Sequence, residues 1–479
     1  MTTDATKSNS RKNLASSAKS GFKKLSVRSV VIYLMQLIST LILSRFLIPK
    51  DYGIFGIIQN WLGSGNYLTD IGLTDGLIQQ KEEISKEQLS AYLFVRLTLA
   101  TLVASCFFIG IFFFHEKLGI EIGKQYLICF LGLLSLLEVL SASPKMIFQK
   151  TMNFDRLAKM EISSSISLYV FQIIFAVSGF GFWSMFAGIL IRYFVIIGVG
   201  FRSGCYTIPK YKNLQSVKHL YRRGAFYQLN LGVVFVVGII TPILLKSYLS
   251  MHDVGLYFWS IGLVSIPMSI IFNFQNVVFP AISKIQDNVD EVKILFNRGS
   301  ELFLLIIFLL FGLGATLSIP LVDLLFNEKW YGAKEFISAI SFIFIFYSVR
   351  QIPMVLLTSL GKSLEKFMAE LSFLVSLVLS SIYLLPEYGI MGFIYASVFS
   401  HLVAFIIGIS FCSSFFYASF YHNLFTLIIA LGSAFFQIHK LGLSGSLVWS
   451  LILFVVNMIV IMALLNRKLL KSCLGQLKR

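Results

Sequence analysis

Fourteen apolar stretches divide this chain, and most are about as long as a helix that crosses a lipid bilayer. Charged side chains make up only 13% of the 479 residues, whereas soluble proteins average roughly 25%. The sequence therefore predicts an all-α polytopic membrane protein with 12–14 transmembrane helices. The expected spans are 29–47, 53–76, 89–114, 126–143, 161–179, 181–201, 226–246, 254–279, 301–325, 334–357, 368–385, 387–411, 423–438 and 443–465.

The basic residues lie mainly on one side of this series of spans. Of the 40 Lys and Arg residues, 29 fall in the segments on the same side as the two termini, 7 fall on the opposite side, and 4 fall within spans. Because cytoplasmic loops carry the excess of Lys and Arg, both termini are expected in the cytoplasm. The net charge of +17 then reflects topology and attraction to anionic membrane lipids, and calls for no nucleic-acid partner.

A short polar corner at 48–53 joins the first two spans. Pro49 ends one helix, Asp51 is suited to capping the next, and Gly53 lies just inside it. The corner recurs 202 residues later, where Asp253 and Gly255 match Asp51 and Gly53. This recurrence predicts two helical hairpins of the same design.

Further matches follow at an offset of 209, where Pro144 and Glu161 meet Pro353 and Glu370. Each half holds six spans, so the two halves are expected to form two six-helix lobes related as a parallel repeat. The basic segment 144–159 is interpreted as an interfacial helix on the cytoplasmic face. The expected organisation is a basic N-terminus (1–28), an N-lobe (29–201), a linker (202–225), a C-lobe (226–411), accessory helices (412–465) and a basic tail (466–479).

Several stretches together resemble bacterial polysaccharide flippases of the Wzx type, in the multidrug/oligosaccharidyl-lipid/polysaccharide exporter superfamily. They are RFLIPKDYGIFG with DIGLTDGLIQ, PKMIFQKTMNFDRLAKME, GFGFWSMFAGIL, and DVGLYFWS with FPAISKIQ, and the similarity covers most of residues 25–415. The resemblance implies a transporter that flips undecaprenyl-diphosphate-linked oligosaccharide across the bacterial inner membrane, for O-antigen, capsule or exopolysaccharide synthesis. It also implies the polymerase and chain-length regulator of that pathway as partners. Span seven departs from the expected pattern because it contains no acidic residue.

Three arginines lie within predicted spans, where a central arginine costs about 2.5–3.5 kcal/mol to insert. Arg192 and Arg350 lie near the middle of their spans, and Arg96 lies nearer the cytoplasmic end of the third span. One interpretation is a cationic cavity that receives a diphosphate or acidic sugars, because the guanidinium fork binds two phosphate oxygens at once. Tyr347 and Gln351 share a helical face with Arg350 and join this candidate path. Tyr92 lies one helical turn from Arg96 in the same way. The alternative is that the arginines pair with buried carboxylates such as Glu138 or Glu370 and fix helix packing.

Two further groups of polar residues lie in the predicted spans. Asn273, Gln275 and Asn276 are candidates for contacts with sugar hydroxyls, or for hydrogen bonds between helices. Glu138, Glu161 and Glu370 are candidates for proton or sodium coupling. For Glu161 and Glu370 the favoured alternative is a structural role at helix starts, where the helix dipole favours a carboxylate.

The sequence offers no catalytic or metal-binding motif, and its six histidines are scattered. We therefore expect no enzyme activity and no cofactor, with transport driven by a gradient of H⁺ or Na⁺ or by the substrate gradient. Two other functions remain open. One is an ion-coupled multidrug exporter of the same superfamily, and the other is a membrane-embedded polysaccharide polymerase or ligase, which would need larger external loops.

Overall fold

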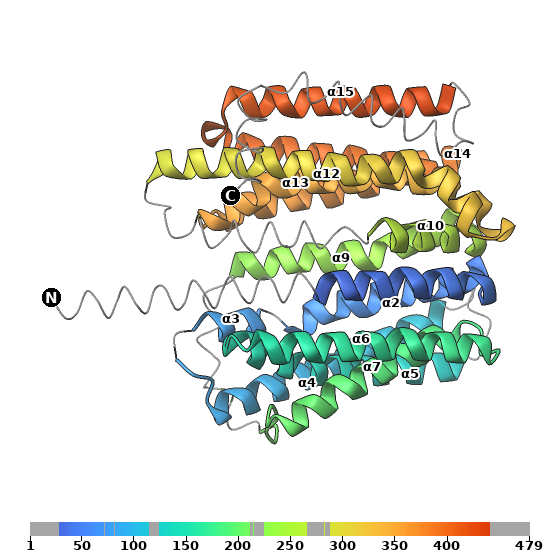
Figure 1. Cartoon of the computed structure of the whole chain (residues 1–479). Coiled ribbons are helices and arrows are strands. Elements are labelled where there is room, and N and C mark those ends of the chain that lie inside the picture. The colour runs from blue at the N-terminus through green and yellow to red at the C-terminus, as the bar shows by residue number, and fades with distance from the viewer. Residues whose placement is uncertain are drawn as a thin grey trace. The chain divides into compact units, whose positions relative to one another are not determined.

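The structure is a computed structural model that describes residues 28–70, 72–80, 82–114, 124–210, 214, 225–265, 282 and 288–440 (Figure 1). Within these residues every regular element is helical and no strand is present. Eight of the described helices are long and apolar enough to cross a membrane. The prediction of an all-α polytopic membrane protein is confirmed.

The described residues form two compact units. Unit 1 runs to Leu47 and continues from Ile57 to Gly238, and unit 2 consists of Ile48–Gly56 and the chain from Ile239 onward. The predicted lobe and linker boundaries stay a prediction. Unit 1 contains Arg28–Phe46, α3 (Leu73–Gln79), α4 (Lys86–Phe114), α5 (Lys124–Lys150), α6 (Phe154–Val177) and α7 (Trp183–Arg202).

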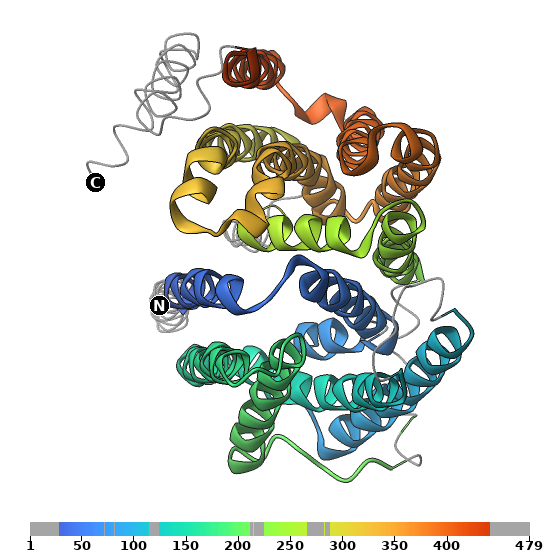
Figure 2. The ribbon, with the colours of Figure 1, turned by 90° about the vertical axis from the view of Figure 1, so that its right-hand side faces the viewer.

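Unit 2 contains the remaining helices, and two long helices contribute to both units. It holds α10 (Met251–Val264), α12 (Val289–Leu325), η3 (Glu328–Ala333), α13 (Lys334–Ser359), α14 (Ser363–Ser410), η4 (Ser413–Phe415) and α15 (Ala418–Lys440). The helices α2 (Pro49–Asp70) and α9 (Ala225–Tyr248) cross the division. Seen end-on in Figure 2, the α6–α7 hairpin of unit 1 shows its two helices packed side by side.

Thirteen of the fourteen predicted spans coincide with described helices, wholly or in part, and the last, 443–465, lies outside the described residues. Two of the thirteen fall within α14. At 48 residues this helix would be about 72 Å long if straight, more than twice the hydrocarbon thickness of a bilayer. The chain instead departs from helical geometry at Gly389, where φ is 59° and ψ is −135°. Only glycine adopts this conformation readily, so α14 divides into the two predicted spans.

Each unit contains a contact between a proline and a glycine that matches the predicted repeat. A methyl group at Gly200, near the end of α7, would lie 2.4 Å from Pro144 Cγ in α5. A methyl group at Gly408, near the end of α14, would lie 3.4 Å from Pro353 Cγ in α13. Pro144 and Pro353 are the residues that the offset of 209 aligns. These equivalent contacts are consistent with a two-lobe repeat.

The segment 144–159 is not a separate interfacial helix, so that interpretation is wrong. Its first half is the last part of α5, which continues through Pro144 to Lys150, and its second half begins α6 at Phe154. Met152 turns the chain between them with φ of 53°. The basic residues that suggested a surface helix therefore lie at the facing ends of two long helices.

At the repeated corner α2 already begins at Pro49, so Asp51 lies inside its first turn and not at the predicted cap position. The Asp51 carboxylate accepts a hydrogen bond of 3.0 Å from the backbone N–H of Ile48, which stabilises the start of α2 at Pro49. In the matching corner, Asp253 lies in the first turn of α10 and its backbone N–H donates to Ser250 Oγ. Both aspartates thus occupy equivalent positions in the first turn of their helix, which supports the predicted match between the two corners.

The glycines of the two corners meet inside unit 2. A methyl group at Gly53 would lie 2.6 Å from the carbonyl oxygen of Met251, and one at Gly255 would lie 1.7 Å from the carbonyl oxygen of Pro49. A methyl group at either glycine would also lie 3.1 Å from the backbone nitrogen of the other glycine. The starts of α2 and α10 are therefore packed backbone to backbone, as small residues allow between membrane helices.

Gly255→Ala is expected to destabilise the protein strongly, because its methyl group cannot fit against the backbone of Pro49. Overpacking of this kind costs about 1–3 kcal/mol or more. Gly262→Ala in the same helix is the matched control, since nothing lies within 4 Å of the added methyl group. Thermal unfolding and monodispersity of the purified protein in detergent measure the difference. Equal stability of the two variants would contradict the close contact.

Candidate functional site

Arg96 is held inside unit 1 by residues from two helices. It is the eleventh residue of α4 and is 1% exposed. Its guanidinium donates to Tyr92 Oη at 2.6 Å and to Asn66 Oδ1 at 2.7 Å, and it lies 3.3 Å from Asp70 Oδ1. The predicted neighbour Tyr92 is confirmed. Arg96 therefore joins α4 to the end of α2. Its positive charge is compensated by Asp70 of the same unit.

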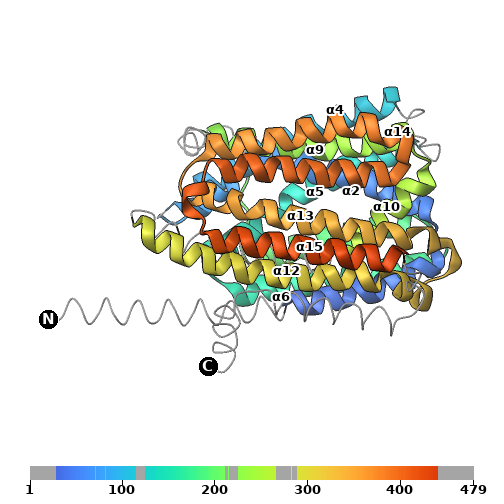
Figure 3. The same cartoon turned by 90° about the horizontal axis from the view of Figure 1, so that it is seen from above.

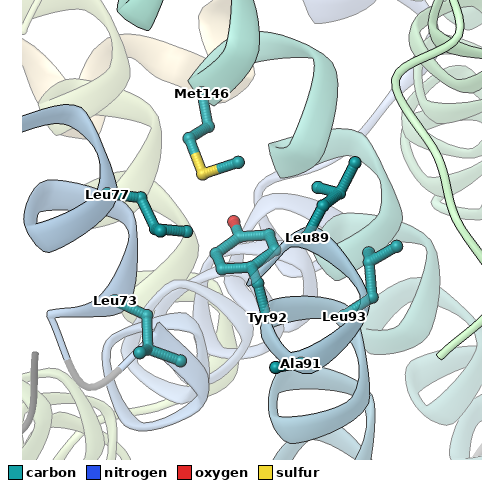
Figure 4. Packing of buried hydrophobic residues seen from close by; sticks show 7 residues of the cluster. All are labelled: Leu73, Leu77, Leu89, Ala91, Tyr92, Leu93 and Met146. Carbon is teal, nitrogen blue, oxygen red and sulfur yellow. The ribbon is translucent and has the colours of Figure 1, made fainter. Parts of the chain in front are cut away.

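The Tyr92 phenol lies where this polar network meets an apolar cluster. Figure 4 shows its ring among side chains of α3, α4 and α5, and its hydroxyl also lies 3.1 Å from Thr74 Oγ1. The other members of the cluster are Leu73, Leu77, Leu89, Ala91, Leu93 and Met146. Since the ring is fully buried, the position of Arg96 is fixed by packing as well as by charge.

Arg350 is closed off inside unit 2. It is 5% exposed, and its Nη1 lies 3.4 Å from Glu370 Oε2. Its guanidinium also lies 4.3 Å from the ring centre of Phe373 and 5.5 Å from that of Tyr347, a predicted neighbour. The His401 ring stacks on the Phe373 ring, with 4.6 Å between the two ring centres. Arg350 thus has the contacts that the packing alternative predicts, and Gln351 is buried beside it.

Glu161 and Glu370 do not lie at helix starts, so the predicted favourable position at the helix dipole is wrong. Each is the eighth residue of its helix, counted from Phe154 in α6 and from Ser363 in α14. The dipole effect fades within the first turn, and arginines stabilise these carboxylates instead. Glu161 forms an ion pair and hydrogen bond with Arg28, and Glu370 pairs with Arg350.

Arg192 has different surroundings from the other two arginines. It is the tenth of the twenty residues of α7, and its side chain is half-buried in unit 1. Among the described residues it forms no ion pair, whereas Arg96 and Arg350 each form one. The Nε atoms of all three arginines have no hydrogen-bond partner. Its electrostatic neighbours are Glu138 and Lys145 of α5. What distinguishes this arginine is that its charge is half-buried and is not compensated by an ion pair among the described residues.

Lys145 is a site residue that the sequence reasoning missed. It lies within the electrostatic range of Arg192, Glu138, Glu161 and Arg28, and it is half-buried. The basic pattern of 144–159 predicts a surface helix at this position, whereas Lys145 belongs to the long helix α5. The signal that would have found it is its spacing of seven residues from Glu138, which places both on one face of a helix. We call Lys145 and Arg192 the cation pair of unit 1.

The other predicted site residues are distributed as follows. Glu138 lies beside the cation pair and within the electrostatic range of Arg96. Asn273, Gln275 and Asn276 lie outside the described residues. Within the described part of the chain, no group of three or more His, Cys, Asp or Glu side chains is suited to a metal ion.

Comparison with protein families relates the chain to polysaccharide biosynthesis. The family model described as "Polysaccharide biosynthesis protein" matches residues 42–335. This range includes the repeated corner, the cation pair and the start of α13.

Two curated relatives have informative names. The succinoglycan biosynthesis transport protein ExoT of Rhizobium meliloti is 25% identical over 308 residues, covering 62% of this chain and 60% of that protein. The lipopolysaccharide biosynthesis protein WzxC of Escherichia coli is 23% identical over 322 residues, covering 65% of this chain and 63% of that protein. The match spans less than two thirds of the length of each relative.

Solved structures support the fold. The lipid II flippase MurJ in an inward closed conformation superposes with a TM-score of 0.71, covers 92% of this chain and 97% of its own, and is 14% identical. An inward-facing multidrug-resistance transporter of the MATE family superposes with a TM-score of 0.59 at 12% identity, covering 82% of this chain and 98% of its own. At these identities the likeness concerns the fold alone.

Replacing one member of the Arg350–Glu370 pair is expected to destabilise the protein by about 3–5 kcal/mol, since the remaining charge stays buried without a partner. The variants are Arg350→Met, Glu370→Gln and the double variant, compared by thermal unfolding in detergent. The double variant is expected to lose less than the sum of the two single variants. Arg192→Met, which breaks no ion pair among the described residues, is the control and should lose much less. Additive losses would show that the pair contributes no coupling.

Proposed function

The chain belongs to the family of polysaccharide biosynthesis proteins, and on that premise we propose that it flips an undecaprenyl-diphosphate-linked oligosaccharide repeat unit across the bacterial inner membrane. The product would enter O-antigen, capsule or exopolysaccharide synthesis. The observation that carries the proposal is the cation pair of unit 1, two basic side chains without ion-pair partners among the described residues, within a fold of membrane helices.

A diphosphate matches the chemistry of the cation pair. The guanidinium of Arg192 is suited to bonding two phosphate oxygens, and the ammonium of Lys145 supplies a second positive charge nearby. Both side chains are half-buried, so a ligand would replace water around them without breaking a salt bridge. Arg96 and Arg350 are buried and paired, so we assign them to holding helices in position rather than to the substrate.

The transport cycle we propose is alternating access. The oligosaccharide and diphosphate would occupy a hydrophilic path while the polyprenyl chain stays in the lipid. The relatives support this reading, because one is named as a transport protein of succinoglycan synthesis and another as a lipopolysaccharide biosynthesis protein. A gradient of H⁺ or Na⁺ would drive the cycle, or the gradient of the substrate itself.

The protein is a multi-pass membrane protein, as its long apolar helices indicate. We further propose that it resides in the inner membrane with both termini in the cytoplasm, because 29 of its 40 Lys and Arg residues lie on that side. The polymerase and the chain-length regulator of the same pathway are the proposed protein partners.

A multidrug exporter of the MATE type shares the fold and is the second candidate. Cationic drugs need acidic or aromatic surroundings. The half-buried charges of unit 1 include the cation pair, Lys145 and Arg192, which would repel a cationic drug. The named relatives also belong to polysaccharide synthesis and include a transport protein, which disfavours a polymerase or ligase.

Arg192→Ala and Lys145→Ala are each expected to reduce transport about tenfold or more, since each removes a charge-assisted contact worth about 1.5–3 kcal/mol. The assay complements a deletion strain and measures surface polysaccharide and undecaprenyl-linked repeat units on the inner leaflet, at matched membrane levels of the protein. Arg202→Ala is the control, because this exposed arginine ends the same helix α7 as Arg192.

Accumulation of repeat units on the inner leaflet in the deletion strain, with rescue by wild type and Arg202→Ala only, would support the proposal. Single repeat units that reach the outer leaflet but stay unpolymerised would identify a polymerase instead. Full rescue by Arg192→Ala and Lys145→Ala would overturn the assignment of the cation pair.

A further inference from the structure

A base and an acid lie at the same level where α5 meets α6. Residues 151–153 join the two helices, and Phe148 of α5 belongs to one buried cluster with Leu157 of α6 beside this connection. Lys145 lies one turn before Phe148 on the same face of α5. Glu161 lies one turn after Leu157 on the same face of α6. Lys145 and Glu161 are therefore both one turn from the cluster, and each is within electrostatic range of the other.

Glu161 already has a different basic partner. Arg28, at the start of the helix Arg28–Phe46, forms an ion pair with Glu161, and its Nη1 donates a hydrogen bond to Glu161 Oε2. Lys145 forms no ion pair among the residues that the structure describes. One carboxylate thus has two basic neighbours, and only Arg28 is paired with it.

The Arg28–Glu161 pair is accessible to water, unlike its counterpart in unit 2. Its side chains are 23% and 20% exposed, whereas those of Arg350 and Glu370 are 6% and 11% exposed. In Figure 3, α13, which carries Arg350, lies alongside α12 and α14, against which it packs. A partly solvated ion pair contributes little net free energy, so its carboxylate can change partner at low cost. A buried pair cannot, because the charge left behind stays uncompensated.

The partner of Glu161 decides the charge that Lys145 offers to an anion. While Glu161 is paired with Arg28, the ammonium of Lys145 and the guanidinium of Arg192 are both available. When Glu161 pairs with Lys145, that ammonium is neutralised and its hydrogen-bond donors are occupied. A diphosphate would then keep only one of its two charged contacts, so its affinity would fall.

We propose that Glu161 is a movable counter-ion and that Arg28 is the positioning residue that controls it. Paired with Arg28, Glu161 leaves the cation pair free to hold a diphosphate. Released from Arg28, it pairs with Lys145 and displaces the diphosphate. A displacement of the helix Arg28–Phe46 would cause this exchange. The role rests on the proposed function and adds to it the step that frees the substrate.

The test measures binding of farnesyl diphosphate, a short polyprenyl diphosphate, to the purified full-length protein in detergent by titration calorimetry. Farnesol, which lacks the diphosphate, is the control for partitioning into the detergent. Arg28→Gln is expected to weaken binding about tenfold, the effect of losing one charge-assisted contact, because Glu161 then pairs with Lys145. The double variant Arg28→Gln/Glu161→Gln is expected to regain the wild-type affinity, since no carboxylate then competes for Lys145.

This recovery separates the proposed role from two others. If Arg28 bound the diphosphate itself, removing the Glu161 carboxylate would not restore the affinity. If the pair only stabilised the fold, the single variants would lower the unfolding midpoint and leave the affinity unchanged. Either result would overturn the proposal. Arg28→Lys keeps the positive charge and is expected to keep most of the affinity.

Matched variants keep the test decisive. Arg45→Gln removes an exposed arginine from the other end of the same helix, and Asp155→Asn removes an exposed carboxylate from the first turn of α6. Both are expected to bind like the wild type. Should Arg28→Gln fail to fold, Glu161→Gln alone still tests the role. It is expected to bind farnesyl diphosphate at least as tightly as the wild type but to transport less in the complementation assay, because release is slowed. Weaker binding by Glu161→Gln would contradict the counter-ion role.

Failure of this role and failure of the proposed function can be told apart. If the wild type binds farnesyl diphosphate no more tightly than farnesol, the cation pair is not a diphosphate site and both proposals are wrong. If the wild type binds it but the double variant does not regain affinity, only the counter-ion role is wrong. If the affinities follow the expected pattern while complementation shows no flipping, the counter-ion role stands and the flippase function does not.

Discussion

The cost of placing a charge in a low-dielectric interior is the constraint on which this structure depends. A buried ion must find a partner and hydrogen bonds, or its desolvation penalty is not recovered. Arg96 with Asp70, Arg28 with Glu161 and Arg350 with Glu370 supply the ion-pair partner and join separate helices. These pairs therefore act as fixed points between helices whose apolar faces would otherwise slide on one another.

The two halves of the chain share a scaffold but differ in where charge is placed. The contacts of Pro144 with Gly200 and of Pro353 with Gly408 recur in both units. At the offset of 209 that aligns Pro144 with Pro353, however, Glu138 of unit 1 corresponds to Tyr347 of unit 2, and at the offset of 208 that relates Gly200 to Gly408, Arg192 corresponds to Ser400. The carboxylates Glu161 and Glu370 occupy matching positions in the two halves, but the arginines that pair with them, Arg28 and Arg350, do not. Equivalent helices thus support a half-exposed charged region in one unit and a sealed ion pair in the other.

Close packing of backbone against backbone also occurs at positions that the repeat relates. Gly53 and Gly255 occupy matching corners, and each is required because the partner backbone fills the space of a side chain. The break at Gly389 follows from a different need, since a straight α14 would exceed the bilayer thickness. In both cases the absence of a Cβ atom, rather than flexibility, explains the glycine.

The sequence by itself determined the membrane class, nearly all the described helices, the recurring corners and the matches between halves. These features depend on apolar runs, proline, glycine and short-range capping, which act within a few residues. It also placed Arg96 beside Tyr92 and Arg350 beside Tyr347, because neighbours on one helical face are fixed by the helix period.

Only the tertiary structure decided which charges are compensated. Asn297 reaches Phe415 across 118 residues, Arg28 reaches Glu161 across 133, and Arg96 reaches Asn66 across 30. The apolar pattern of a membrane helix says that it is buried in lipid or protein, but it does not say which helix lies against it. For this reason the sequence could not separate the buried, paired Arg350 from the accessible Arg192, nor show that Glu161 pairs with Arg28.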